Sequence, residues 1–287
     1  MSIKVENLIH IYDKGLLTEQ IALEDISFEI EDGQLVGVMG HTGSGKSTLL
    51  QHLNGLLKPE SGTIVVGGVD ITGKDVKMVD IRKRVGLVFQ YPEYQLFEET
   101  VEKDIAFGPK NLGLSDEEIL ERVKESLELV GLDYDSIGQR SPFELSGGQK
   151  RRVAIAGVIA MHPEVLILDE PTAGLDPKAH EDILHMIEEV HRRTGNITIF
   201  VSHNMADIAK LSDKILVIND GRLIMHGTPL EVYSRKEELR EVGLELPPVT
   251  ELVEELKENG MHIEGTILDI DTAVEKIAEA IKNNNKK

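Results

Sequence analysis

A glycine-rich segment between two apolar runs constrains the fold of this chain more than any other feature. The run Leu35–Met39 before it predicts a buried strand, and the run from Ser47 to Leu53 predicts the first turns of a helix. A strand, a glycine-rich loop and a helix in this order are the setting of a phosphate-binding loop. The glycines let backbone N–H groups turn toward an anion, and the helix N-terminus favours negative charge. The segment consists of Gly40, His41, Thr42, Gly43, Ser44, Gly45, Lys46, Ser47 and Thr48.

The side chains at the end of this loop suit a nucleoside triphosphate. Lys46 can reach the β- and γ-phosphates, and the Ser47 hydroxyl can coordinate Mg²⁺. An ordinary glycine-rich turn is the alternative interpretation. We predict that the chain binds a nucleoside triphosphate through the nine loop residues.

The composition excludes several classes of protein. The 287 residues carry a net charge of −20, which argues against nucleic acid as the main partner, because duplex binding relies on Lys and Arg. The chain has no cysteine, so it forms neither a disulfide framework nor a thiolate metal site. No secretory signal is visible, and the longest apolar or small run, Val153–Met161, is about half of a membrane span. We expect a soluble chain that reaches a membrane only through a partner.

Acidic residues are concentrated in one segment. Between Tyr91 and Asp135 there are 13 Asp and Glu against four Lys and Arg. A solvated helical surface is one interpretation of this excess. The other is a docking face for a basic partner.

The remaining apolar runs predict an α/β fold. Short alternating runs in residues 3–36 indicate an antiparallel β layer. Later runs are apolar on both faces and alternate with helices such as Lys178–Arg193, which predicts a mostly parallel sheet covered on both sides. Ser115 with its acidic successors indicates a helix start within the charged segment. The predicted strands are Thr63–Val66, Val85–Phe89, Val165–Leu168, Ile197–Val201 and Ile215–Ile218.

The chain changes character after Pro229. Residues 230–287 are acidic and rich in helical pattern, and they are interrupted by Leu246–Val249. We therefore predict a catalytic domain over 1–229, with a helical subdomain inserted at about 93–162, and a C-terminal helical appendage over 230–287. The last five residues are expected to fray.

Two further motifs narrow the family. Leu145 to Lys150 reads Leu-Ser-Gly-Gly-Gln-Lys, and Ser146 with Gln149 has the spacing of a capping box at a helix start. The two glycines between them leave N–H groups open to an anion. An apolar strand then ends in Asp169 and Glu170. These segments resemble the signature motif and the Walker B strand of ATP-binding-cassette (ABC) ATPases, and their spacing from the phosphate loop matches that family over residues 1–230.

The resemblance implies the P-loop NTPase fold of an ABC nucleotide-binding domain, with ATP and Mg²⁺ as ligands. It also implies that two cassettes sandwich two nucleotides. Ser146, Gly147, Gly148 and Gln149 of one chain would close over the γ-phosphate of ATP bound by the other.

The resemblance assigns roles to the residues that follow the strands. A carboxylate at the end of an apolar strand needs a partner, and Mg²⁺ held jointly with Ser47 would serve Asp169. Glu170 corresponds to the catalytic base. Gln90 corresponds to the Q-loop glutamine that contacts Mg²⁺ or water, and His203 to the switch histidine at the γ-phosphate. The alternatives are a capping Glu, a surface amide and a structural histidine. With Lys46, these residues form the predicted catalytic set.

Two weaker assignments complete the site. Asp176 ends the segment Ala173-Gly174-Leu175-Asp176, which matches the D-loop at the interface between cassettes. Tyr12 lies where the family places an aromatic that stacks on adenine, although it could equally be a core residue.

The segment after Gln90 resembles one branch of the family. Residues 90–101 and 104–111 are similar to the ATPases of energy-coupling factor transporters, in particular to the second, A-prime, type. This implies uptake of vitamins or related micronutrients and a peripheral position at the cytoplasmic face of the membrane. The implied partners are a paralogous ATPase, a transmembrane coupling protein and substrate-binding membrane proteins. Basic residues of the coupling protein would meet the acidic segment at Glu93, Glu98, Glu99, Glu102 and Asp104.

Three other functions remain open from the sequence. The ATPase of a cobalt or nickel importer shares most of these motifs. A soluble cassette acting on nucleic acid or ribosomes is disfavoured by the single acidic cassette, and a scaffold for cofactor assembly is the third. The transported substrate is not encoded here, because another protein binds it. Both halves of a composite ATP site are present, so a homodimer of the isolated chain is possible beside the heterodimer.

Overall fold

The computed structural model describes residues 1–73 and 75–284 and contains two β-sheets. The first sheet is antiparallel, in the order β2-β1-β4-β5. Its strands alternate buried and exposed residues, as expected for a sheet with one covered face. The antiparallel layer predicted from residues 3–36 is therefore confirmed. The strands are β1 (Ile3–Tyr12), β2 (Gln20–Ile30), β4 (Ser61–Val66) and β5 (Val69–Asp70).

The second sheet is mostly parallel, in the order β10-β9-β3-β8-β7-β6. Only β10 runs antiparallel to its neighbour. Every residue of β3, β7 and β8 is buried, which explains why these strands have continuous apolar runs. The strands are β3 (Leu35–Met39), β6 (Val85–Val88), β7 (Val165–Leu168), β8 (Ile197–Val201), β9 (Lys214–Asn219) and β10 (Arg222–Gly227).

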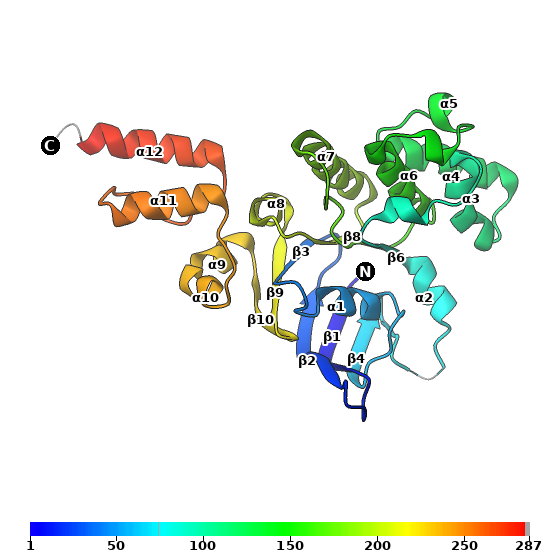
Figure 1. Cartoon of the computed structure of the whole chain (residues 1–287), viewed down its shortest axis with the longest axis horizontal. Coiled ribbons are helices and arrows are strands. Elements are labelled where there is room, and N and C mark those ends of the chain that lie inside the picture. Colours follow the sequence, from blue (N-terminus) through cyan, green and yellow to red (C-terminus); the bar gives the residue numbers. More distant parts are fainter. Residues whose placement is uncertain (74, 285–287) are drawn as a thin grey trace.

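Two hydrophobic clusters cover the two faces of this sheet. Successive residues of β7 belong to different clusters because side chains alternate across a strand. Leu166 and Leu168 pack with the long helices, whereas Val165 and Ile167 pack with α1 and the antiparallel sheet. Figure 1 shows α1 lying over the antiparallel sheet. The helices around the sheet are α1 (Lys46–Leu53), α2 (Met78–Arg84), α7 (Pro177–Thr194) and α8 (Met205–Leu211).

The segment between β6 and β7 forms a helical subdomain at one end of the molecule (Figure 1). Ser115 is the N-cap of α4, as its sequence predicts, and the structure adds a capping box with Glu118. Ser146 and Gln149 form the predicted capping box, at the start of α6. The elements are η1 (Pro92–Gln95), α3 (Val101–Asn111), α4 (Asp116–Leu129), α5 (Tyr134–Ile137), η2 (Pro142–Glu144) and α6 (Gly147–Ile159).

The C-terminal helices fall into two pairs. Val232, Tyr233 and Leu239 of the first pair are buried in the main core, whereas the second pair has a small cluster of its own that includes Val253 and Ala273. Only the second pair stands apart in Figure 1. The boundary at 229 stays a prediction, and residues 285–287 of the predicted frayed end lie outside the described residues. The pairs are α9 (Pro229–Ser234) with α10 (Lys236–Glu241), and α11 (Pro248–Glu258) with α12 (Ile270–Asn284).

Over the described ranges, no helix combines the length and the apolar character that a membrane crossing needs.

Candidate ATP-hydrolysis site

The predicted site residues gather at one edge of the parallel sheet. The phosphate loop follows β3, Gln90 follows β6, Asp169 and Glu170 follow β7, and His203 follows β8. These strands are parallel neighbours, so their carboxyl ends meet at one edge. Ligands of open α/β sheets bind at this edge.

Two loop positions accept only glycine. A Cβ at Gly40 would lie 2.1 Å from the carbonyl oxygen of Ile218. Gly45 has φ +106°, and a Cβ there would lie 2.6 Å from the carbonyl oxygen of Ala22. The loop is therefore held in its turned conformation by the strands around it, and glycine is required for the close approach.

The amino end of α1 is open to a ligand. Gly45 is its N-cap and supplies no side chain, and the first turn contains no acidic residue. A helix without a side-chain cap leaves its first N–H groups for another acceptor, and the helix dipole favours an anion there. Thr42 and Gly43 are exposed in front of this end, and a Cβ on Gly43 would meet no atom within 4 Å.

Lys46 lies within the loop. Its Nζ donates hydrogen bonds of 2.7 Å to the carbonyl oxygens of Gly40 and His41, and the residue is only 5% exposed. Burial lowers the pKa of Lys46, and the charges of Glu170 and Asp169 partly offset this. A buried cation held by two carbonyls beside two carboxylates suits the binding of a polyphosphate.

Asp169 follows β7 and Ser47 lies in the first turn of α1, so the two side chains are neighbours at the site. Burial raises the pKa of Asp169, and the nearby Ser47 hydroxyl counteracts this, as does the charge of Lys46. A hydroxyl and a carboxylate are hard oxygen ligands of the kind that Mg²⁺ prefers. Within the described ranges no three His, Cys, Asp or Glu side chains form a metal cluster, so phosphate and water oxygens would complete the coordination. The two residues fit Mg²⁺.

Glu170 lies at the centre of a hydrogen-bonded group. Its Oε2 accepts from Gln90 Nε2 at 2.7 Å, and its Oε1 lies 2.6 Å from His203 Nε2. The backbone of Glu170 has φ +51°, a conformation that costs a non-glycine residue free energy. The structure thus unites Gln90, Glu170 and His203, which come from three separate strand ends.

Tyr12 lies beside the phosphate loop. Its Oη is 3.2 Å from the Thr48 hydroxyl, and its ring packs edge-to-face on His10 with centroids 4.5 Å apart. Tyr12 is 38% exposed, so the interpretation as a core residue is wrong. Ser44, by contrast, is buried, and its hydroxyl finds no hydrogen-bond partner in the described part of the chain.

His41 turns away from the loop. Its Nε2 lies 2.5 Å from the carbonyl oxygen of Val242, the residue that ends α10, and its ring packs near Gly243. The side chain therefore connects the phosphate loop to the C-terminal region. The contribution of His41 to the loop comes from its backbone: its carbonyl oxygen accepts a hydrogen bond from Lys46.

The first turn of α6, which carries the signature segment, has no protein atoms of the described residues packed against its two glycines. Ser146 and Gln149 satisfy each other's backbone N–H groups, and a Cβ on Gly147 or Gly148 would meet no atom within 4 Å. Asp176 is the N-cap of α7 and accepts from two backbone N–H groups of its first turn. Its contact with nucleotide stays a prediction.

Comparison with known proteins identifies the family. The ABC transporter family profile matches residues 23–173. Energy-coupling factor transporter ATP-binding protein EcfA2 of Clostridium perfringens (strain 13 / Type A) is 59% identical over 285 residues, which cover 99% of this chain and 100% of that protein. The protein of the same name from Clostridium tetani is 56% identical over 283 residues, 99% of this chain and 98% of that one. The chain belongs to the ATP-binding proteins of energy-coupling factor transporters, within the ABC transporter family.

Solved structures share the fold of this ABC ATPase. The cbiO1 protein of Clostridium perfringens, described as part of the ABC transporter complex cbiONQ, has a TM-score of 0.74 and 39% identity, covering 88% of this chain and 98% of that chain. The cassette MJ0796, solved as a dimer with ADP and Pi, has a TM-score of 0.69 and 28% identity. The match covers 79% of this chain and 98% of that chain. The predicted P-loop NTPase fold of an ABC nucleotide-binding domain is thereby confirmed.

The acidic segment of this ATPase is less free than its sequence indicates. Glu93 forms two hydrogen bonds, of 2.8 and 3.1 Å, with the guanidinium of Arg151. Arg151 is 1% exposed and also donates to the carbonyl oxygens of Pro171 and Ala173. The prediction that Glu93 offers its charge to a partner is wrong, because a buried cation already neutralises it.

Three of the other four acidic residues, Glu99, Glu102 and Asp104, are also engaged within the chain, and a partner contact of Glu98 stays a prediction. Glu99 pairs with Lys103 at 2.6 Å, and Glu102 accepts from Gln139. Asp104 accepts the backbone N–H groups of Phe97 and Glu98, so it organises the turn before α3. These carboxylates therefore make contacts within the helical subdomain, which they stabilise.

We expect Glu93→Ala to lower the free energy of unfolding by about 3 kcal/mol, because the substitution leaves a buried guanidinium without its anion. The pKa of Glu93 is lowered: burial raises it, but the hydrogen bond from Arg151, a backbone hydrogen bond and the Arg151 charge together outweigh burial. The stabilisation is therefore present at neutral pH and is lost as the pH falls through the folded-state pKa. Urea unfolding at neutral pH and at a pH below the folded-state pKa of Glu93 measures this stabilisation. Glu99→Ala, which removes an exposed pair, should leave the midpoint unchanged, and an equal loss in both variants would contradict the assignment.

Sequence reasoning missed Arg151, whose position beside Lys150 in the signature helix gives no sign of burial. Its four hydrogen bonds join the segment after Gln90 to the segment after Glu170. The partners lie 20 to 58 residues away in the chain. Only tertiary structure brings them together.

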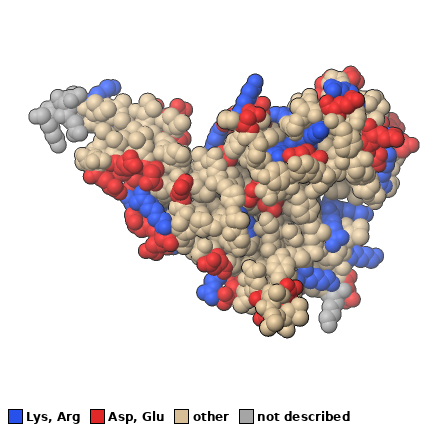
Figure 2. Space-filling model, viewed as in Figure 1, with Lys and Arg blue, Asp and Glu red and all other residues tan. Residues whose placement is uncertain are grey.

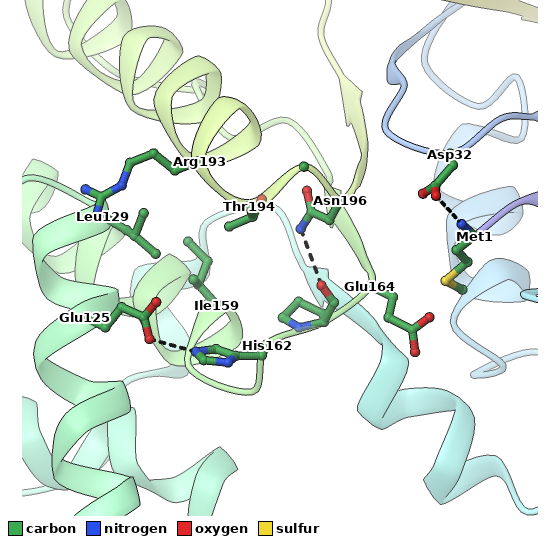
Figure 3. A pocket seen from close by; sticks show the side chains of 12 residues that line it. Met1, Asp32, Glu125, Leu129, Ile159, His162, Glu164, Arg193, Thr194 and Asn196 are labelled. Atoms are coloured by element: carbon green, nitrogen blue, oxygen red, sulfur yellow. Dashed lines mark hydrogen bonds and ion pairs between the residues drawn. The ribbon is translucent and has the colours of Figure 1, made fainter.

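A separate cavity of about 540 Å³ lies at the opposite edge of the sheet (Figure 3). It is lined by Glu164 and Asn196, which come just before β7 and β8. Several of its polar groups pair with each other: the Met1 amino group lies 2.6 Å from Asp32, and His162 lies 3.0 Å from Glu125. It is therefore not the nucleotide site, which requires the carboxyl ends of the strands.

Proposed function

We propose that the chain is the ATP-hydrolysing subunit of a membrane importer of the energy-coupling factor type, which couples hydrolysis to uptake of vitamins or related micronutrients. The observation that carries this proposal is the hydrogen-bonded group of Gln90, Glu170 and His203 beside Lys46. Relatives that match 99% of this chain are named energy-coupling factor transporter ATP-binding protein EcfA2, which supports the proposal.

Each residue has a role that follows from its geometry. Lys46 would exchange its two carbonyl partners for phosphate oxygens when ATP enters the loop. Ser47 and Asp169 would hold Mg²⁺, which neutralises charge on the phosphates. Thr48 and the other loop residues would present N–H groups to the phosphates, and Tyr12 would stack its half-exposed ring on adenine.

Glu170 is the proposed general base. Gln90 and His203 each contact one oxygen of its carboxylate and orient it, and the remaining lone pairs of these oxygens would accept a proton from water. His203 would contact the γ-phosphate, and Gln90 would report the position of the membrane partner. Catalysis then rests on positioning and charge stabilisation, as in other phosphoryl transfers.

The proposed partner at the ATP site is a second cassette, either the paralogous ATPase or another copy of this chain. The open helix end at Ser146–Gln149 has no bulk in front of it, so it can receive the γ-phosphate of the other subunit. Asp176 would lie at the same interface. A stripe of exposed apolar residues on α12, formed by Ile270, Val274 and Ile281, would add contacts to the dimer.

The proposed docking surface for the transmembrane coupling protein is an apolar groove of about 390 Å³ between α2, η1, α3 and α6. Phe97 and Phe107 line it with rings in edge-to-face contact at 5.1 Å, and they are 58% and 49% exposed. Exposed apolar patches of this kind are sites of protein interaction. On the face shown in Figure 2, acidic side chains gather over the helical subdomain and basic ones beside α2, so the groove lies between both signs of charge. In this proposal the ATPase would lie peripherally at the cytoplasmic face of the membrane.

We expect Phe97→Asp combined with Phe107→Asp to reduce copurification with the polytopic membrane protein at least tenfold, because a desolvated charge at an apolar contact is costly. ATP binding should be unchanged. Leu120→Asp, at an exposed residue of α4 outside the groove, is the control and should copurify normally. Assembly of the double variant at the wild-type level would refute the docking surface, and loss of ATP-dependent uptake alongside lost assembly would support the importer function.

A further inference from the structure

A series of polar contacts, through a half-buried histidine and two buried residues, connects the first turn of α7 with the loop that carries His203. His180 Nε2, in the first turn of α7, lies 3.0 Å from the carboxylate of Asp207 on α8. His180 Nε2 is equally close to both oxygens of that carboxylate, and Oδ2 also accepts from the Ser202 hydroxyl at 3.1 Å. Asp207 and Ser202 are each 4% exposed. None of these three residues belongs to the predicted catalytic set.

Ser202 acts directly on the backbone around His203. Its hydroxyl oxygen accepts the backbone N–H of Asn204 at 3.0 Å, so the residues before and after His203 are bonded to each other. The Ser202 hydroxyl donates its own hydrogen bond to Asp207, and this orients its oxygen lone pairs toward the N–H of Asn204. The turn that carries His203 is therefore held by Asp207.

The His180 end of this series of contacts is also fixed. The backbone N–H of His180 donates to the carbonyl oxygen of Asp176, whose side chain caps α7. His203 in turn lies 2.6 Å from Glu170. Contacts through His180, Asp207 and Ser202 therefore run without a break from the first turn of α7 to the residues around His203, which contacts the proposed base.

A purely structural link between the two helices would not need burial. Lys210 and Glu181 already join α8 to α7 at the surface, with a distance of 2.9 Å. Burying a carboxylate costs free energy that its partner only partly returns, so a buried pair is weak evidence for a role in stability. Asp207 accepts from Ser202, the residue immediately before His203, and this is better explained by a role in orienting His203.

We propose that His180, Asp207 and Ser202 are positioning residues that set the orientation of His203 for ATP hydrolysis. The proposal rests on the proposed role of His203. In a two-cassette complex it would let the position of α7, which begins at Asp176, control the rate of hydrolysis. The link acts on the chemical step and leaves the contacts of Lys46 with ATP unchanged.

The test is ATP hydrolysis by the full chain in its two-cassette complex. We expect His180→Ala to lower kcat about tenfold, as small misplacements of catalytic groups do, with KM for ATP changed less than about twofold. His180→Arg should restore kcat to within about threefold, because a guanidinium can donate to Asp207. Asp207→Asn, which preserves shape, should reproduce the loss. Lys210→Ala is the matched control for the contact between α7 and α8 and should leave kcat unchanged.

A double-mutant cycle distinguishes positioning from general destabilisation. In a His203→Ala background, single-turnover hydrolysis should fall less than about twofold further on adding His180→Ala, because the residue to be positioned is gone. A tenfold loss in both backgrounds, or an equal loss in Lys210→Ala, would overturn the proposal. Wild-type hydrolysis by His203→Ala alone would refute the proposed role of His203, and the positioning role with it.

Discussion

Glu170→Gln should reduce steady-state ATP hydrolysis by about 10³-fold, the range expected when a general base is removed. The amide can still accept the hydrogen bond from Gln90 but cannot take a proton from water. Radiolabelled phosphate release measures the loss. ATP affinity should stay within about twofold of wild type, since Lys46 and the loop bind the phosphates.

The same variant should accumulate a closed dimer with ATP, because the step that opens the complex is blocked. Size-exclusion chromatography with and without ATP detects this species. Glu164→Gln is the matched control: it lies immediately before β7, at the opposite end from Glu170, where it pairs with Arg84. It should hydrolyse ATP at the wild-type rate. Full-rate hydrolysis by Glu170→Gln would exclude the residue as the base.

Lys46→Ala should raise the Kd for ATP about 100-fold, or about 3 kcal/mol, the value of charge-assisted hydrogen bonds to phosphate. The cation is buried between the loop carbonyls and two carboxylates, so the variant leaves Asp169 and Glu170 as uncompensated anions facing the phosphates. This repulsion adds to the lost hydrogen bonds. Isothermal titration calorimetry with ATP measures the change.

Lys4→Ala serves as the control for this experiment, because Lys4 is an exposed lysine on β1 that pairs with Glu6. It should bind ATP as the wild type does. Circular dichroism should show that both variants are folded. An unchanged Kd for Lys46→Ala would mean that the phosphates bind elsewhere.

The sequence was most informative where function depends on neighbours along the chain. The phosphate loop, the helix starts at Ser115 and Ser146, and the strand ends at Asp169 and His203 are all contiguous patterns. Backbone conformation and helix capping depend on residues within a few positions of each other, so such patterns can be interpreted without a structure. The parallel sheet followed from its continuous apolar strands for the same reason.

Sequence reasoning was weakest for charged side chains. It left the acidic segment open between a solvated surface and a docking face that includes Glu93, whereas Glu93 is neutralised by Arg151 within the chain. A charge count cannot distinguish a free carboxylate from a paired one, because the partner lies 58 residues away. The apolar groove at Phe97 and Phe107 was missed for a related reason, since its walls come from four elements.

The sequence by itself determined that this chain has a phosphate loop, a signature motif and an acidic strand end, and hence that it is an ABC ATPase. Only the tertiary structure decided how these parts contact each other. It brings together His41 and Val242, which are 201 residues apart in the sequence, Glu93 and Arg151, which are 58 apart, and His180 and Asp207, which are 27 apart. The physical reason is that local motifs are set by backbone geometry over a few residues, whereas a buried ion pair forms only where the packed core brings distant side chains within 3 Å or so of each other.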